Sequence, residues 1–533
     1  MKELNWVKAT PQRDPVFYRE GSKYLVGGEI REWKGDLFEI FSPVFEKREG
    51  NFQQRLLGRC SLLNCDVAKE ALTAAVKAYD NGHGEWPTAT VAKRIHCTEK
   101  FLEKMKEKRM DIAQLLCWEI AKPWADSLAE VDRTIDYAWA TIEALKDLDR
   151  QSSGFVRSSG FFAQIRRSPY GVALCMGPYN YPLNETFATL IPALMMGNPV
   201  IVKLPRLGML CNMPLLEAFA DSFPPGVINI ISGEGSTVVT PIIESGQIDL
   251  LAFIGSAKVA NLLNQRHPRP NRLRSVLGLG AKNVGIVLKD ADLEMSVKEC
   301  LQGALTFNGQ RCTALKLLFV HRSIADEFIE KFCESLDALK GGMPFEDGVA
   351  LTPLPEKAAV EKMSQYVDDA IQKGAKIRNK YGGDMDRTYF HPAVLYPVQE
   401  TMRVWTEEQF GPVVPISPFD DPNEVIEYLA RSPFGQQASL FGKDSLTLGK
   451  LIDALVNQVC RVNLNTQCRR GPDTFPFGGR KDSAEGTLSV TDALRSFSIR
   501  TVVAAKNSEE NFKITRSIVN GRTSQFLSTD YLF

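Results

Sequence analysis

The spacing of hydrophobic residues changes along the chain, and the change separates a helical region from an alternating one. In residues 66–145 apolar positions recur every three or four residues, as in DVAKEALTAAVKAYD, which is the repeat of one helix face. From residue 169 onward, short apolar runs alternate with helix-length segments. The runs are GVALCMG, PVIVKLP, VINIISG and LLAFIGS, and helices are expected near 184–197, 210–221 and 235–245. Such alternation predicts βαβ units and a parallel sheet.

A second α/β region is predicted from about 276 to 470, where LLFVH and VVPIS have the apolar pattern of strands. Two further segments, 161–169 and 496–505, are strand-like but lie outside both regions. Residues 507–533 form a polar tail for which the pattern predicts no defined element. The predicted fold class is therefore α/β, with separate sheets in two parts of the chain.

Composition limits the function more than the fold. The 533 residues include 64 Lys and Arg and 64 Asp and Glu, so the net charge is 64 − 64 = 0. A neutral chain gives no bulk attraction to nucleic acid or to an anionic membrane, although a local basic pocket for a small anion stays open. The longest apolar stretch, 190–202, is interrupted by Pro192, Gly197 and Pro199 and is too short to cross a bilayer. We expect no nucleic-acid partner and no membrane partner.

Cysteine and histidine usage bears on metals and on the cellular compartment. Eleven cysteines occur without a CxxC pair, and the five histidines lie far apart in the sequence, so no metal site is expected. So many unpatterned thiols favour a reducing compartment. The N-terminal segment MKELNWVKATPQRD lacks the apolar stretch of a secretory signal. We therefore expect a cytoplasmic protein.

Two predicted strand ends carry groups suited to phosphate. The segment VINIISGEGSTVV places Gly233 and Gly235 between a strand and a helix, where backbone N–H groups approach a pyrophosphate. Val238 stands where the GxGxxG pattern has its third glycine, so a plain strand–helix turn is an open alternative. The strand PVIVKLPR ends in Lys203 and Arg206, two cations where an open α/β sheet places ligands. Their alternative interpretation is as solvated surface cations.

The segment FNGQRCTA, residues 307–314, places Cys312 in a short polar turn before the strand LKLLFV. A nucleophilic cysteine needs access and a lowered pKa, and the neighbouring Arg311 would supply positive charge. Without further context a single cysteine is more often a small buried hydrophobic residue.

Six motifs follow one another in the order CMGPYNYP (175–182), FIGSAKVA (253–260), LGLGAKN (277–283), FNGQRCTA, EEQFGPV (407–413) and FPFGGRKDS (475–483). Together they resemble the aldehyde dehydrogenase superfamily over roughly residues 25–505. The resemblance implies a Rossmann-type cofactor domain, an α/β catalytic domain and a β-arm that pairs subunits into a homodimer or homotetramer. The implied bounds are 1–150 with 169–275 for the cofactor domain, 276–473 for the catalytic domain, 151–168 with 495–506 for the bridging strands, and 507–533 for the tail.

The resemblance also implies roles for single residues. Cys312 matches the thiol that attacks the aldehyde, and Asn180 matches the donor that, with a backbone N–H near Cys312, stabilises the resulting oxyanion. The positions that match cofactor contacts are Glu408 and Phe410 for the nicotinamide ribose, and Phe253, Gly255 and Ser256 for the turn that faces the phosphates.

Further positions are similar to the non-phosphorylating glyceraldehyde-3-phosphate dehydrogenases of this superfamily. The four that match contacts to the substrate phosphate are Arg133, Tyr181, Arg311 and Arg470. Guanidinium groups suit a phosphate dianion, and a phenol adds a neutral donor. Ordinary surface ion pairs are the alternative for Arg133 and Arg470. Arg206 stands where NAD-preferring members have Glu, and with Lys203 it would attract a 2′-phosphate, so NADP is the expected cofactor, with NAD possible.

One position departs from the family pattern. The family motif LELGGKN reads LGLGAKN here, so Gly278 stands where the water-activating Glu is expected and Ala281 replaces a Gly. The spacing from Gly278 to Cys312 is 312 − 278 = 34 residues, as the family requires. Thr189 stands where the family usually has Lys, and Ala484 stands where it usually has Gly. Because a general base is worth about 10²–10⁴-fold, the substitution puts hydrolysis of the acyl-enzyme in doubt.

The sequence therefore predicts NADP-dependent oxidation of an aldehyde, with glyceraldehyde 3-phosphate as the leading substrate and slow turnover. Two rivals stay open. An acylating enzyme would pass its thioester to another thiol such as coenzyme A, which needs no such Glu. A cofactor-binding pseudoenzyme would have a structural or regulatory role.

Overall fold

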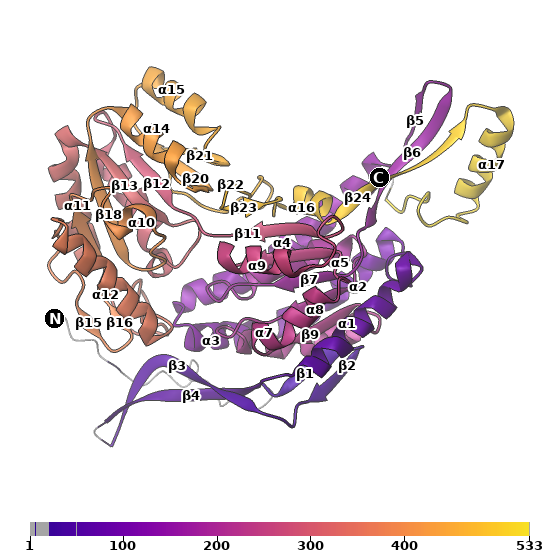
Figure 1. Ribbon diagram of the computed structural model, residues 1–533, viewed down its shortest axis with the longest axis horizontal. Helices are drawn as coiled ribbons and strands as arrows, with labels where there is room; N and C mark the ends of the chain where they lie inside the picture. The colour runs from indigo at the N-terminus through magenta and orange to yellow at the C-terminus, as the bar shows by residue number, and fades with distance from the viewer. Residues whose placement is uncertain (1–5, 7–20, 50, 532–533) are drawn as a thin grey trace.

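The computed structural model describes Trp6, residues 21–49 and residues 51–531 (Figure 1). The N-terminal segment MKELNWVKATPQRD, predicted to be no secretory signal, lies outside the described residues except for Trp6. Helices fill the region where the 3.6-residue repeat predicted them: α1 (Cys65–Tyr79), α2 (Val91–Glu107), α3 (Arg109–Glu119) and α4 (Trp124–Gln151). The sequence pattern missed the strands before them, which are β1 (Lys23–Val26), β2 (Glu29–Glu32), β3 (Leu37–Arg48) and β4 (Asn51–Ser61).

The first large sheet has eight strands in the order β2-β1-β9-β8-β7-β10-β11-β23. Its parallel members are β7 (Ala173–Met176), β8 (Val200–Lys203), β9 (Ile228–Ile231), β10 (Leu250–Ile254) and β11 (Arg274–Gly278). The helices between them are α5 (Asn184–Met195), α6 (Leu216–Ser222), α7 (Gly235–Val238), α8 (Thr240–Glu244) and α9 (Ala257–Arg266), with the 3-10 helix η3 (Leu210–Leu215). The predicted βαβ alternation is confirmed.

The strand order of this sheet reverses direction at β7. From β7 the chain moves outward through β8 and β9, then returns to the other side of β7 for β10 and β11. In open α/β sheets such a switch point leaves a crevice at the carboxyl ends of the strands, where ligands bind. Residues just after β7 and β10 are therefore placed to line a site.

The second large sheet has seven strands in the order β14-β17-β18-β13-β12-β20-β21 and is parallel except for the edge strand β14 (Lys376–Ile377). Its other strands are β12 (Asn283–Val287), β13 (Leu315–His321), β17 (Ala393–Tyr396), β18 (Val413–Phe419), β20 (Gln437–Phe441) and β21 (Arg461–Leu464). The helices of this part are α10 (Leu293–Leu305), α11 (Ala325–Asp337), α12 (Lys357–Gln372), α13 (Arg403–Thr406), α14 (Pro422–Arg431) and α15 (Ser445–Leu455). Figure 1 shows this sheet and its helices as a separate layer beside the first sheet.

Short elements complete the two bodies. They are the 3-10 helices η2 (Asp80–Gly82), η4 (Thr306–Gly309) and η5 (Arg322–Ile324), the strands β15 (Met385–Asp386), β16 (Tyr389–Phe390), β19 (Phe434–Gly435), β22 (Arg480–Lys481) and β23 (Ala484–Glu485), and the helix α16 (Val490–Ser496). Through β23 the segment after residue 480 returns to the edge of the first sheet, beside β11.

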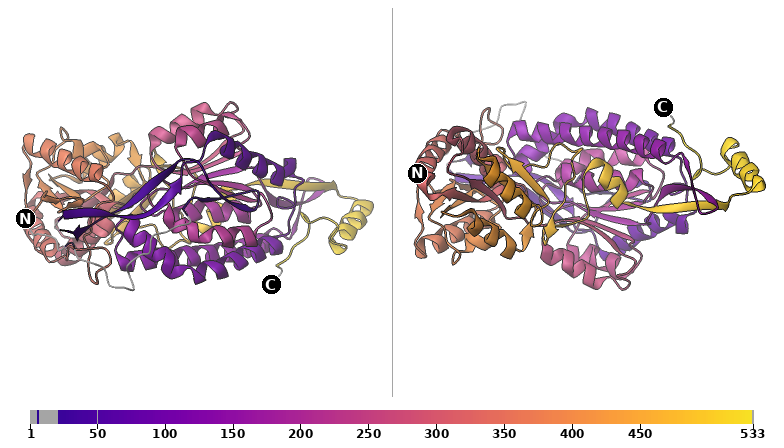
Figure 2. Two further views of the ribbon diagram at one scale, coloured as in Figure 1. Left: turned by 90° about the horizontal axis from the view of Figure 1, so that it is seen from below. Right: turned by 90° about the horizontal axis from the view of Figure 1, so that it is seen from above.

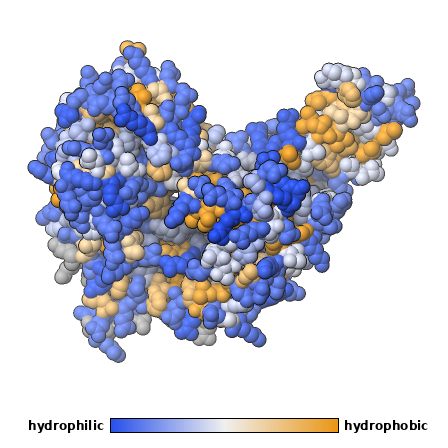
Figure 3. Space-filling model, in the orientation of Figure 1, coloured by the Kyte–Doolittle hydropathy of each residue, from blue (hydrophilic) through white to orange (hydrophobic). Residues whose placement is uncertain are grey.

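A three-stranded antiparallel arm projects from the end of the molecule opposite the second sheet (Figure 2). Its strands β5 (Phe155–Ser158), β6 (Phe161–Pro169) and β24 (Ser498–Lys506) confirm the prediction of strands outside both sheets. The arm exposes the large apolar side chains Phe155, Val156, Phe161, Val502 and Val503, and Figure 3 shows an apolar surface there.

The C-terminal tail contains a helix that the polar pattern did not predict. Helix α17 (Glu509–Asn520) begins after Ser508, whose hydroxyl caps it by accepting from the Asn511 N–H. The Phe512 ring stacks on Phe162 of the arm with centroids 4.4 Å apart. The helix is amphipathic, and its packing on the arm adds to its stability.

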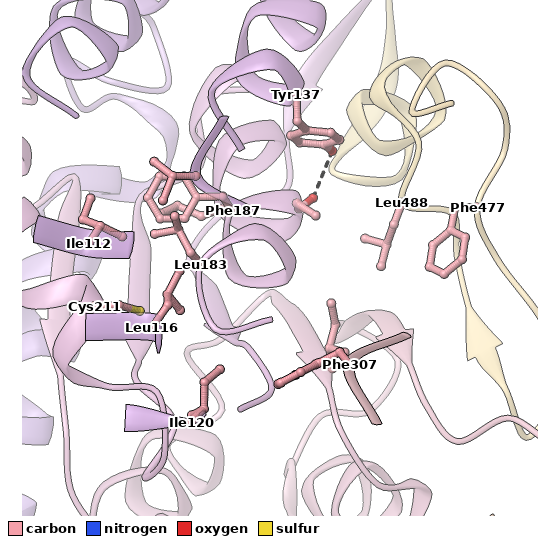
Figure 4. Close-up of a cluster of buried hydrophobic side chains, with 14 of the residues drawn as sticks. Ile112, Leu116, Ile120, Tyr137, Leu183, Phe187, Cys211, Phe307, Phe477 and Leu488 are labelled. Carbon is pink, nitrogen blue, oxygen red and sulfur yellow. Dashed lines mark hydrogen bonds between the residues drawn. The ribbon is translucent and has the colours of Figure 1, made fainter. Parts of the chain in front are cut away.

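One hydrophobic core runs beneath the junction of the two sheets (Figure 4). Phe187 of α5 and Leu183 just before it pack with Leu116 of α3, and Tyr137 of α4 donates a hydrogen bond to the Ala188 carbonyl at 3.2 Å. Phe307, from the loop after α10, belongs to the same core. The loop that carries Cys312 is thus anchored on rigid helices.

No helix among the described residues combines the length and apolarity needed to cross a membrane. In the same part of the chain, no group of three or more His, Cys, Asp or Glu residues is arranged to hold a metal ion. All eleven cysteines are free thiols.

Candidate active site

A cavity of about 910 Å³ opens at the carboxyl edge of the first sheet and reaches the second. Asn180, Gly278 and Cys312 lie on its wall, contributed by the segments after β7, at the end of β11 and before β13. Five of the six sequence motifs contribute residues to the cavity wall. The sixth, FPFGGRKDS, is followed directly by β23, in which Ala484 pairs with Gly278.

The loop before Cys312 is held in a strained conformation. Phe307, Asn308 and Gly309 have φ of 49°, 54° and 72°, and consecutive left-handed residues that are not glycine are costly and occur where surrounding contacts enforce them. Asn308 supplies such contacts: its amide donates to the Thr352 carbonyl at 2.9 Å and its oxygen accepts from the Thr352 N–H at 3.2 Å. These hydrogen bonds offset the cost of the strained backbone and fix the loop that carries Cys312.

Two buried amide side chains hold Cys312 itself. Asn283 donates to the Cys312 carbonyl at 2.8 Å, and Gln436 hydrogen-bonds the thiol. Burial raises the pKa of Cys312 to about 11; the charge of Glu185 contributes to the rise, whereas Gln436 and Arg470 oppose it. The expected help from Arg311 is not seen, because its guanidinium donates to the carbonyls of Gln302 and Gly303.

Asn180 is placed as a hydrogen-bond donor beside the nucleophile loop. Its side-chain amide donates to the Gln310 carbonyl at 2.7 Å, and the amide group carries a second N–H. The backbone carbonyl of Asn180 accepts a hydrogen bond from Lys122 at 2.8 Å, and Lys122 forms a fully buried ion pair with Glu130. The turn between β7 and α5 is therefore fixed by a buried charge pair that sequence reasoning missed.

The cofactor residues predicted from sequence gather along aligned strand ends. In the strand registers, Met176 of β7 pairs with Lys203 of β8 and with Phe253 of β10, and Lys203 pairs with Ile231 of β9. Gly255 and Ser256, just after β10, line the cavity, while Phe253 is buried behind them. The Ser256 hydroxyl caps α9 by accepting from the Val259 N–H.

The glycines after β9 lie at the same edge but outside the cavity wall. Gly233 has φ of 125°, and a Cβ there would lie 2.9 Å from the Leu63 carbonyl oxygen, so only glycine fits this turn. Helix α7 begins at Gly235, where a Cβ would meet no atom within 4 Å. Gly235 therefore has open space beside it, and phosphate binding at this turn stays a prediction.

The two cations after β8 differ in their surroundings. Burial lowers the pKa of Lys203, while Glu234 opposes the effect. The Arg206 side chain is 64% exposed and forms an ion pair with Glu356 at 2.9 Å. Neither lines the 910 Å³ cavity, so both belong to the outer part of the sheet edge.

Glu408 and Phe410 lie on the cavity wall opposite the first sheet. Lys316, which is almost fully buried, lies 3.4 Å from Glu408 Oε1 and 4.8 Å from the centre of the Phe410 ring. Burial raises the pKa of Glu408, and the charge of Lys316 opposes the rise.

The four predicted phosphate contacts share the cavity, but two of them already have carboxylate partners. Arg133 donates to Asp473 at 2.9 and 3.2 Å. Arg470, 5% exposed, pairs with Glu185 and donates to the Leu488 carbonyl at 3.2 Å. Sequence reasoning missed both acids: Asp473 lies three residues after Arg470, and Glu185 five residues after Asn180, with no motif to mark either.

The remaining two contacts are arranged differently. The Tyr181 ring lies beneath the Lys122 ammonium, 3.4 Å from ring centre to Nζ, in a contact typical of cation–π pairs. Arg311 Nε is buried without a hydrogen-bond partner among the described residues, and the same is true of Arg470 Nε. The Arg311 N–H is suited to an incoming anion, whereas Arg470 Nε lies 3.5 Å from the Asp473 carboxylate.

Gly278, the vacant base position, ends β11 on the cavity wall. A Cβ built there would lie 3.3 Å from Ile254 Cγ1, so a side chain needs only a small shift of its neighbour. Thr189 is fully buried in α5, where its hydroxyl donates to the Thr186 carbonyl at 2.8 Å. It therefore contributes nothing polar to the cavity.

Comparisons with known proteins agree on one family. The profile of the aldehyde dehydrogenase family matches residues 47–503. The NADP-dependent glyceraldehyde-3-phosphate dehydrogenase of Streptococcus equinus is 34% identical, covering 88% of this chain and 95% of that protein. The 3-sulfolactaldehyde dehydrogenase of Priestia aryabhattai is 28% identical over 83% and 91% of the two chains. The crystal structure of the NADP-dependent glyceraldehyde-3-phosphate dehydrogenase from Bacillus halodurans C-125 complexed with NADP matches with a TM-score of 0.84 and 30% identity, covering 92% of this chain and all of that one.

Proposed function

The chain belongs to the aldehyde dehydrogenase family, and from that premise we propose that it oxidises a small anionic aldehyde with NADP. Glyceraldehyde 3-phosphate is the leading substrate and 3-phosphoglycerate the product. The observation that carries the proposal is one cavity whose wall holds the thiol of Cys312, the amide of Asn180 and a set of guanidinium groups.

The chain's own residues support the following sequence of events. The Cys312 thiolate attacks the aldehyde carbon, and the Asn180 amide stabilises the oxyanion of the thiohemiacetal. A bound NADP, held by residues of the first sheet's edge, would supply the hydride acceptor needed to convert this adduct into a thioester. Water then attacks the thioester and releases the carboxylic acid. Because burial holds the pKa of Cys312 at about 11, the thiol needs a changed environment before it reacts at neutral pH.

The residues present fit a dinucleotide at the edge of the first sheet. Apart from its ion pair with Lys316, Glu408 Oε1 is buried with no hydrogen-bond partner among the described residues, which suits a ribose hydroxyl. Gly255 and Ser256 open the helix α9 at the cavity wall, where backbone N–H groups suit phosphate. Arg206 and Lys203 would hold the 2′-phosphate, in keeping with the NADP named for the relatives.

An anionic substrate is supported by the guanidinium groups rather than by overall charge. Arg311 has a buried Nε without a hydrogen-bond partner among the described residues, whereas Arg470 Nε, also without a hydrogen bond there, lies 3.5 Å from Asp473 Oδ1. The names of two relatives specify small aldehydes that carry a phosphate or a sulfonate. The Glu185 partner of Arg470 weakens this attraction, so we expect binding to depend more on Arg311.

The test compares glyceraldehyde 3-phosphate with D-glyceraldehyde, which differs only by the phosphate. NADPH formation should be far more efficient with the phosphate ester. Arg311→Gln should lower kcat/KM for the ester by about tenfold to a hundredfold, the worth of a charge-assisted hydrogen bond of ~1.5–3 kcal/mol, and leave D-glyceraldehyde little changed. Equal activity of the wild type on both aldehydes would contradict the phosphate assignment.

The acylating alternative is favoured by one observation, the missing base at Gly278. The acylating alternative predicts that coenzyme A speeds product release and that the product is an acyl thioester of coenzyme A. Release of free acid at the same rate with and without coenzyme A would exclude it.

The proposal also covers the two domains, the subunit contact and the cellular compartment. We propose that the first sheet forms the cofactor domain, the second the catalytic domain, and the arm a subunit contact. The exposed apolar side chains of the arm suit a homodimer or homotetramer, and eleven free thiols suit the reducing cytosol.

A further inference from the structure

Hydrolysis of the Cys312 thioester needs a group that takes a proton from water, and Gly278 has no side chain to do so. Among the described residues that line the cavity, the carboxylates are Glu185 and Glu408. We propose that Glu185 is the catalytic base that activates the deacylating water. This inference rests on the proposed function, because it concerns the second half of the same reaction.

Glu185 is placed beside the nucleophile although it comes from a different element. It lies in the first turn of α5, 8% exposed, on the wall of the cavity that also holds Cys312. Its negative charge is close enough to raise the pKa of Cys312, and of the charged neighbours it has the largest effect. A water bound between the thioester and this carboxylate would have a proton acceptor at hand.

The ion pair with Arg470 leaves Glu185 able to act. Arg470 contacts Oε2, whereas Oε1 makes no hydrogen bond to a described residue, so one oxygen can accept from water.

Glu408 is the weaker candidate in the same cavity. Its Oε1 lies 3.4 Å from Lys316, and its Oε2 would lie 3.0 Å from a Cβ at Gly280, so its carboxylate is confined beside the motif that ends β11. In the proposed function this carboxylate holds a ribose hydroxyl and is then unable to take a proton from water.

The proposed step balances without a further reactant. The water oxygen forms a bond to the thioester carbon while one water proton passes to Glu185 Oε1. The carbonyl electron pair moves onto the oxygen that faces Asn180. The tetrahedral adduct then collapses, the carbon–sulfur bond breaks, and the electron pair leaves with Cys312. The proton on Glu185 is returned to the thiolate or to solvent, and the carboxylic acid departs.

The test separates the two half-reactions by rapid mixing with saturating NADP and glyceraldehyde 3-phosphate. Glu185→Gln keeps the shape of the side chain and removes the base. The burst of NADPH should keep its amplitude, and the later steady rate should fall by about tenfold or more, within the ~10²–10⁴ that a general base supplies. Glu217→Gln changes the exposed first-turn glutamate of α6 and should leave both phases unchanged.

Three further readouts distinguish a catalytic base from a structural residue. In Glu185→Gln the steady rate should rise about tenfold per pH unit, since hydroxide replaces the base, whereas the wild-type rate levels off. Hydroxylamine, a strong nucleophile that needs no base, should restore turnover of Glu185→Gln. The double variant Glu185→Gln with Gly278→Glu should recover turnover without hydroxylamine. Should Glu185→Gln fail to fold, Glu185→Asp keeps a carboxylate and should show a reduced rate that still levels off with pH.

The outcomes are distinguishable. A Glu185→Gln enzyme with wild-type burst and wild-type steady rate overturns the assignment of Glu185 and leaves the proposed function intact. Equal losses in both phases also overturn it, because they indicate a role in binding or acylation. Absence of any burst in the wild type, with no acyl group on Cys312, overturns the proposed function itself.

Discussion

The loop that carries Cys312 and the strand end that carries Gly278 face one cavity but differ in how much structure supports them. The first holds three consecutive left-handed residues and is fixed by the amides of Asn308 and Asn283. The second is a regular strand end between β10 and β23 with no side chain to fix. Strain of this kind persists where a precise geometry is needed.

Under the proposed mechanism, the difference means that the two halves of the reaction are under separate control. Attack on the aldehyde depends on the loop and on Asn180, which are present with their supporting contacts. Hydrolysis of the acyl-enzyme depends on a base, and at Gly278 that base is missing. Changes to the loop should therefore abolish chemistry, and changes at β11 should affect only the later step.

The largest effect is expected from Cys312→Ser. The hydroxyl is a far weaker nucleophile, so both the burst and the steady rate should fall by roughly 10⁴-fold or more, as when a nucleophile is removed from a catalytic unit. NADP binding, measured by titration of protein fluorescence, should stay at the wild-type Kd. Substantial NADPH formation by this variant would show that another residue is the nucleophile.

The next largest effect is expected from Asn180→Ala. Loss of one oxyanion donor costs about 10²–10³-fold, and the loss should appear in the burst rate measured by stopped flow. The Gln310 carbonyl also loses its donor, so the melting temperature is measured in parallel. A burst rate within threefold of wild type would remove Asn180 from the oxyanion site.

The reactivity of Cys312 should depend steeply on pH. With a pKa of about 11, only ~10⁻⁴ of the thiol is ionised at pH 7 in the cofactor-free protein. Raising the pH increases the thiolate, so alkylation by iodoacetamide should accelerate about tenfold per pH unit between 7 and 9. Peptide mass spectrometry follows Cys312 separately from the exposed Cys460. A rate that levels off below pH 9 would mean that the environment lowers the pKa.

A smaller effect is expected at the outer edge of the first sheet. Arg206→Glu should reduce the preference for NADP over NAD by about tenfold to a hundredfold, since a charge-assisted hydrogen bond of ~1.5–3 kcal/mol becomes a repulsion. Glu356→Gln, which removes the ion-pair partner of Arg206, serves as the control and should not weaken NADP binding. Tighter binding of NAD than of NADP by the wild type would overturn this assignment.

Much of the fold followed from the sequence because each parallel strand is a short apolar run bounded by helix-length segments. Of the strands before residue 65, β3 and β4 were missed because their polar and aromatic residues form a two-stranded hairpin with partly exposed faces, whereas β1 and β2 are short strands that join the first sheet through β9. Helix α17 was missed because the tail was judged by its overall polarity; its Phe512 ring stacks on Phe162 of the arm, a contact between segments far apart in the chain.

The sequence motifs predicted the main residues of the candidate site, but they did not predict the acidic partners of its arginines. Cys312, Asn180 and Glu408 stand in recognisable local patterns and do share a cavity. Glu185 and Asp473 acquire their roles only through pairing with Arg470 and Arg133. Glu185 and Arg470 are 285 residues apart, and no spacing in the sequence predicts such a pair.

The central claim is that acylation and deacylation are separable because the base at Gly278 is missing. The direct test is rapid mixing of the wild type and Gly278→Glu with NADP and glyceraldehyde 3-phosphate, with mass spectrometry of the quenched protein. The wild type should give a burst of at most about one NADPH per active site, then a much slower rate, with the acyl group on Cys312. Gly278→Glu should keep the burst and speed the slow phase, by up to ~10²–10⁴-fold if Ile254, at 3.3 Å from the new Cβ, yields. Fast wild-type turnover without a burst or an acylated Cys312 would contradict the account.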